Sequence, residues 1–85
     1  MKKGRVEKID VKEIFQRHPW LRPDQRSVIL FLAEKRRGAF EAEIRTALDI
    51  PKSTMWRIVK GLEEEGVVEV QQLRRQNYIK LRKLK

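Results

Sequence analysis

The spacing of apolar and polar positions changes along the chain, and this change predicts its elements. Before Gly66, apolar residues recur every three or four positions, as on one face of a helix. After Gly66 they alternate with polar residues, as in a strand with one buried face. The helical part divides into four predicted helices, at about residues 11–17, 23–37, 41–48 and 51–65.

Residues that break helices separate these segments. Pro19 ends the first helix, because proline disfavours a helical conformation at the residue before it. Gly38 is a natural left-handed cap for the second, and the chain up to Phe40 is predicted to form a short extended link. Residues 49–51 form a tight break, and Gly66 terminates the last helix.

The alternating runs VVEVQQ and NYIKLR flank the short stretch LRRQ, which predicts a β-hairpin. Neither Asn-Gly nor Asp-Gly marks the turn, so the pattern leaves the register open. The predicted fold class is α+β and mainly helical, with a three-helix core, a C-terminal hairpin and an extra short N-terminal helix. Residues 1–22 are predicted to form a basic arm and that short helix, and 23–85 the main domain.

The charge balance predicts a polyanionic partner. Lysine and arginine number 21 against 12 acidic residues, a net charge of +9 on 85 residues. Such a surplus attracts polyanions over long range, with nucleic acid as the leading partner and an anionic membrane surface as the alternative. No apolar run approaches the ~20 residues that span a bilayer, and no apolar segment follows the basic N-terminus as in a secretory signal. We therefore expect a cytoplasmic protein.

The sequence lacks the residue groups that enzymes and metal proteins use. It contains no cysteine, which excludes disulfides, thiolate metal sites and cysteine nucleophiles. It also contains no glycine-rich phosphate loop, no metal-ligand cluster and no plausible base for Ser27 or Ser53. We therefore expect no enzymatic activity, no metal and no cofactor.

The helix predicted at 51–65 carries the most informative pattern. One stripe is apolar and must be buried: Met55, Ile58, Val59 and Leu62. The opposite side is polar: Ser53, Arg57, Lys60 and Glu64, flanked by Lys52 and Trp56. Its beginning is basic and its end acidic, the reverse of what the helix dipole favours. A DNA-reading helix needs this order, because its N-terminal half enters the major groove; the alternative is an ordinary amphipathic helix.

The predicted hairpin carries Arg74 and Arg75 at its tip. From residue 66 to 85, six basic side chains stand against the single acidic Glu69. A basic tip at about 72–77 can lie along the DNA backbone or enter the minor groove. The alternative is that the two arginines are solvated turn residues.

The segment IPKSTMWRIVKGLEEEGVVEV, with the basic hairpin after it, resembles the winged helix-turn-helix regulators of the MarR and IclR kind in archaea and bacteria. The shared pattern is STxxRxVKxLEExGxVE. The resemblance implies a double-stranded DNA-binding transcription regulator, and it implies six DNA-facing positions: Lys52, Ser53, Thr54, Trp56, Arg57 and Lys60. The alternatives are a winged-helix protein-interaction module and a non-specific chromatin or RNA-binding protein.

The two tryptophans allow more than one interpretation. Trp56 stands where these regulators commonly have a small polar residue. It either contacts a sugar or a thymine methyl group of the DNA, or packs under the hairpin at the edge of the core. We favour packing at the core edge. Trp20 is predicted to pack with the N-terminal helix. That segment is also the candidate surface for a homodimer, through Ile14, Phe15, Trp20 and Leu21.

Overall fold

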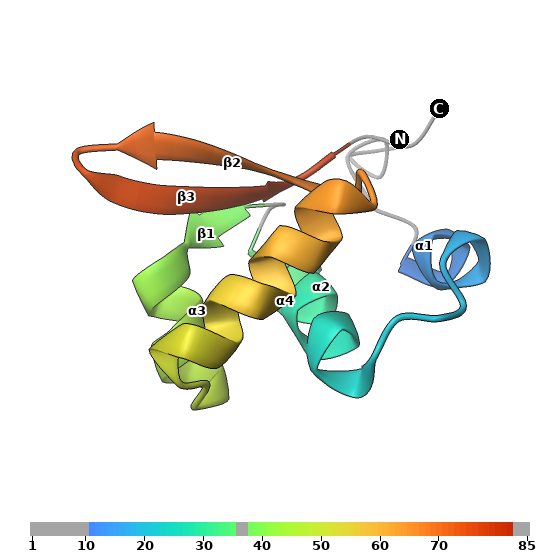
Figure 1. Ribbon diagram of the computed structural model, residues 1–85. Coiled ribbons are helices and arrows are strands. Elements are labelled where there is room, and N and C mark those ends of the chain that lie inside the picture. Colours follow the sequence, from blue (N-terminus) through green and yellow to red (C-terminus); the bar gives the residue numbers. More distant parts are fainter. Residues whose placement is uncertain (1–10, 36–37, 83–85) are drawn as a thin grey trace, which may run out of the picture.

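The computed structural model describes residues 11–35 and 38–82, and its elements confirm the predicted fold class. The described residues form four helices and one three-stranded antiparallel sheet (Figure 1). In chain order the elements are α1 (Val11–Arg17), α2 (Pro23–Glu34), β1 (Gly38–Phe40), α3 (Glu41–Leu48), α4 (Lys52–Glu64), β2 (Val68–Leu73) and β3 (Gln76–Leu81).

The sheet joins the hairpin to the middle of the chain. Its strand order is β1-β3-β2, so β3 pairs with both neighbours, and Ile79 lies opposite Ala39 on one side and Val70 on the other. Near the tip of the hairpin, where Asn77 pairs with Gln72, the Asn77 side chain donates a hydrogen bond of 2.9 Å from Nδ2 to Glu41 Oε1. The hairpin is therefore attached to the start of α3 by strand pairing and by a side-chain contact.

One apolar cluster lies between the helices and the sheet. Helix α2 occupies its centre and contacts α1, α3, α4, β1 and β3. The buried members come from every element: Ile14, Leu21, Val28, Ile29, Leu32, Ala39, Ile44, Met55, Ile58, Val59, Leu62, Val67, Val68, Ile79 and Leu81. The predicted apolar stripe of α4 is thus confirmed, and it seats that helix on the rest of the domain.

The end of α4 confirms the role predicted for Gly66. Its φ is 77°, its N–H donates to the carbonyl of Glu63 at 3.0 Å, and the N–H of Val67 donates to the carbonyl of Leu62 at 3.0 Å. This pair of bonds is the Schellman motif, which glycine permits because it adopts left-handed backbone without a Cβ clash. Val67 is buried and passes directly into β2.

The prediction that Gly38 is a left-handed helix cap is wrong. Helix α2 ends at Glu34, and the N–H of Lys35 donates to the carbonyls of Phe31 and Leu32; residues 36 and 37, where the helix was predicted to end, lie outside the described residues. Gly38 instead begins β1, which confirms the short extended link predicted up to Phe40, and a Cβ on Gly38 would clash with Tyr78 Oη. Glycine is suited to this position because the tyrosine crosses directly over the backbone.

The prediction that Trp20 packs with the N-terminal helix is also wrong. The N–H of Leu21 donates to the carbonyl of His18 at 3.1 Å, closing a turn that places Leu21 in the core and leaves Trp20 60% exposed. The Trp20 ring contacts the His18 ring edge-on, with centroids 5.6 Å apart. The arm at 1–10 lies outside the described residues.

Only part of the surface predicted for a homodimer is exposed and could contact a second chain. Ile14 and Leu21 are 1% and 4% exposed because they fill the domain's own core. Phe15 is half-buried, with the Arg26 guanidinium carbon 5.4 Å from its ring centroid. Only Trp20 of the four predicted residues is largely open, so a homodimer through this segment stays a prediction that now depends on this side chain.

Candidate nucleic-acid interface

The exposed side of α4 is formed by polar and basic residues close to its N-terminus. Pro51 is the N-cap residue, and its carbonyl accepts from the N–H of Met55 at 2.8 Å. The first turn contains no acidic residue, so no carboxylate offsets the partial positive charge of the free N–H groups there. The following side chains are exposed: Lys52, Ser53, Trp56, Arg57 and Lys60. This end of the helix can accept an anion.

The acidic end of α4 is directed toward the N-terminal part of the domain. Glu63, Glu64 and Glu65 are all exposed, and Glu65 Oε1 lies 3.2 Å from His18 Nδ1. Figure 1 shows this end of α4 beside the turn into β2, at the opposite end of the hairpin from its tip. The charge asymmetry predicted for the helix is therefore kept in the folded domain, with its basic half toward α3.

The interpretation that Trp56 packs under the hairpin is wrong. The residue is 60% exposed, and Val59, one helical turn along, fills the buried position instead. Lys60 Nζ lies 5.9 Å from the centroid of the indole ring, within the range of a cation–π contact. The ring thus lies on the open side of α4 and is not part of the core.

A groove separates α4 from the hairpin, and it is partly apolar. It has a volume of about 320 Å³ and is lined by Glu41, Trp56, Val59, Lys60, Glu63, Val70 and Asn77. Trp56 and Lys60 come from α4, whereas Val70 and Asn77 come from the two strands of the hairpin. The exposed side of α4 therefore borders, across this groove, the part of the hairpin between its middle and its tip.

The hairpin turn consists of Arg74 and Arg75 alone. Leu73 pairs with Gln76, so only two residues connect β2 to β3. Both arginines have positive φ, 53° and 66°, and both are exposed. A two-residue turn with positive φ at both positions is of the I′ type, which Asn and Gly favour and arginine does not. Two long cationic side chains therefore occupy turn positions whose backbone conformation favours Asn and Gly.

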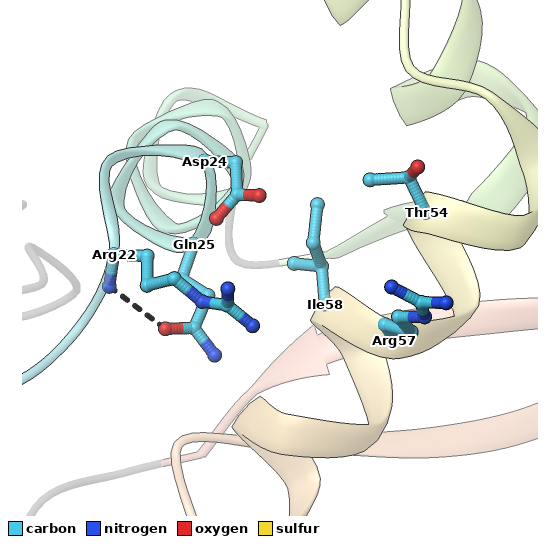
Figure 2. Close-up of a pocket in the computed structure, with 6 residues that line it drawn as sticks. All are labelled: Arg22, Asp24, Gln25, Thr54, Arg57 and Ile58. Atoms are coloured by element: carbon cyan, nitrogen blue, oxygen red, sulfur yellow. Dashed lines mark hydrogen bonds between the residues drawn. The ribbon is translucent and has the colours of Figure 1, made fainter.

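A second hollow flanks α4 on the side away from the hairpin (Figure 2). Its volume is about 70 Å³, and it is lined by Arg22, Asp24, Gln25, Thr54, Arg57 and Ile58. Gln25 Oε1 accepts from the backbone N–H of Arg22 at 2.8 Å, which fixes the start of α2 beside α4. Thr54 is half-buried here, so it faces α2 and not the middle of the exposed stripe.

Arg22 is a candidate that the sequence did not reveal. Its exposed side chain lies across this hollow from Arg57, and Asp24 lines the same hollow (Figure 2). Asp24 Oδ1 is buried without a hydrogen-bond partner. The only sequence signal was a basic residue just before the proline that begins a helix. This signal does not indicate that Arg57 of α4 lies across the hollow from it.

Within residues 11–35 and 38–82, His, Asp and Glu side chains nowhere gather in threes that could hold a metal ion. Over the same ranges, each helix is too short or too polar to cross a membrane.

Comparison with known families places most of the described domain in one family. Residues 27–72, more than half of the chain, match the IclR helix-turn-helix domain. The match begins in α2 and ends in β2, so it includes both helices flanking the break at residues 49–51. No curated protein and no solved structure matches the chain significantly. The chain belongs to the IclR helix-turn-helix family of DNA-binding transcription regulators.

Proposed function

We propose that the domain binds double-stranded DNA with α4 in the major groove and the β2–β3 turn on the phosphate backbone or in the minor groove. One observation carries this proposal: the exposed side of α4, with Ser53, Arg57 and Lys60, continues across a groove into the hairpin that ends in Arg74 and Arg75. A helix of this kind presents its N-terminal residues to base edges, and the hairpin supplies a second contact.

The exposed residues of α4 suit different parts of a duplex. Arg57 can donate two hydrogen bonds to guanine O6 and N7, and Ser53 can contact a base or a phosphate. Lys52, at the N-terminus of the helix, suits a phosphate. Arg22 faces Arg57 across the hollow beside α4 and adds a further cation for the backbone. The same side of the domain thus combines groups for base recognition with groups for phosphate binding.

The salt dependence of binding tests the electrostatic part. Five phosphate contacts, from Arg22, Lys52, Lys60, Arg74 and Arg75, predict that log K falls with log salt concentration at a slope of about −4 to −5 per bound chain. Gel-shift titrations of a duplex selected from a random pool, at several salt concentrations, measure this slope. A complex whose affinity does not change with salt contradicts the mechanism.

Arg57→Ala tests which side chain chooses the bases. We expect this variant to lose about 1–3 kcal/mol of discrimination at one base pair of the selected duplex, because a bidentate contact to guanine disappears. Arg17→Ala is the matched control, since Arg17 is an exposed arginine paired with Glu13 on α1. Binding to single-base variants of the duplex measures the effect. Unchanged discrimination in Arg57→Ala would show that the base-reading surface lies elsewhere.

Two other functions remain as outcomes of the same experiments. The exposure of Trp20 and Trp56 favours a protein-interaction module, since exposed aromatic rings are common in protein interfaces. Capture of a protein partner without any shift of nucleic acid would support that function. Equal affinity for the selected duplex, random DNA and RNA would support a non-specific binder. The cations beside Trp56 favour a polyanion at that position.

A further inference from the structure

Trp56 presents a large apolar surface in the middle of a polar and basic stripe. It is 60% exposed, directly precedes Arg57, and lies one helical turn from Ser53 and from Lys60. Residues three and four apart share a helix face, so the indole belongs to the surface that enters the major groove in the proposed complex. An exposed indole leaves a large apolar area in water, and a partner that covers it gains from burying it.

The exposed ring of Trp56 has a cation beside it and borders a partly apolar groove. Lys60 Nζ lies 5.9 Å from the ring centroid, within the range of a cation–π contact. Val59 and Val70 line the same groove as the indole, so the space beside the ring is partly apolar. The domain therefore offers an exposed apolar surface on α4, next to a groove that is itself partly apolar.

The major groove contains one apolar group that such a ring can cover. Guanine, cytosine and adenine present hydrogen-bond donors and acceptors there, whereas thymine also presents its C5-methyl group. We propose that Trp56 makes the domain select thymine, through contact between the indole ring and this methyl group. This inference rests on the proposed function, because it requires α4 to lie in the major groove.

Removal of single methyl groups from the duplex tests the contact directly. In the duplex selected from a random pool, each thymine is replaced in turn by deoxyuridine, which pairs identically and lacks only the C5-methyl group. We expect one or two positions at which the replacement weakens binding about three- to fivefold, the effect of exposing one buried methyl group, and no change elsewhere. At the same positions 5-methylcytosine should bind better than cytosine by a similar factor.

Two variants assign the effect to the indole. Trp56→Ala should bind the thymine and deoxyuridine duplexes equally, because the ring that covers the methyl group is gone. Trp20→Ala is the matched control: Trp20 is also 60% exposed but lies before α2, and its loss should leave the methyl discrimination unchanged. The deoxyuridine measurement on the unaltered protein does not depend on how either variant folds.

The possible failures are distinguishable. A selected duplex that shows no sensitivity to methyl removal at any thymine overturns the inference, as does a Trp56→Ala variant that keeps the discrimination. If no duplex is selected over random DNA, the proposed function itself fails.

Discussion

Replacing the hairpin turn by Asn-Gly, in the variant Arg74→Asn/Arg75→Gly, is expected to stabilise the domain and to weaken its binding to DNA. Both arginines have positive φ, where a residue with a Cβ is disfavoured by roughly 1–2 kcal/mol. Asn-Gly is the preferred sequence for a turn with positive φ at both positions. We expect the free energy of unfolding to rise by about 1–2 kcal/mol, measured by urea denaturation.

The same substitution removes two cations from the proposed DNA contact. Each neutralised phosphate adds about 0.9 to the slope of log K against log salt, so loss of two predicts about ten- to thirtyfold weaker binding at 0.15 M salt. The slope itself should become shallower by about 1.8. Because Arg74 and Arg75 lie in a turn and not on α4, all duplex sequences should weaken by similar factors.

A charge-conserving variant separates these two effects. Arg74→Lys/Arg75→Lys keeps both cations and both positive φ values, so it should retain most of the DNA affinity and gain no stability. If the Asn-Gly variant is more stable yet binds DNA as well as the original chain, the hairpin tip does not contact DNA. If it is less stable, the explanation in terms of backbone preference is wrong.

Leu62→Ala is expected to produce the largest loss of stability among single substitutions in α4. The side chain of Leu62 projects from α4 and is completely buried in the core. Truncation of a buried leucine costs about 2–5 kcal/mol, which includes the lost burial and the cavity left behind. Small domains have only about 5–15 kcal/mol in total, so urea denaturation should show a much lower midpoint.

Leu30→Ala is the control for this prediction. It makes the same chemical change in another helix, but Leu30 is 47% exposed on α2. We expect its effect to stay within about 0.5 kcal/mol, as for most surface substitutions. Similar losses in the two variants would contradict the burial that seats α4 in the core.

Most of the fold followed from sequence pattern because its signals are local. The change of period after Gly66 separated helices from strands, and glycine at the end of α4 was required by the backbone it adopts. The environment of Gly38 could not be predicted in this way. Its reason is Tyr78, forty residues further along, and the contact exists only after β1 pairs with β3.

The candidate site was less predictable because exposure at the edge of a helical stripe depends on neighbouring elements. Trp56 lies at such an edge, and the buried position beside it is filled by Val59, so the apolar character of the indole misled the sequence interpretation. The residues of the hairpin turn gave no indication of its geometry. Arginine gives no signal for positive φ, so the register of the hairpin had to come from its strand pairing.

The attachment of the hairpin to α3 has a consequence for the duplex. Pairing of β3 with β1, together with the hydrogen bond between Asn77 and Glu41, holds the hairpin in one orientation before any partner arrives. A rigid reader loses little conformational entropy on binding, but it cannot adapt its shape. In the proposed complex the DNA would therefore adjust its groove width and curvature, and flexible pyrimidine–purine steps between the two contacts would be favoured although no side chain touches them.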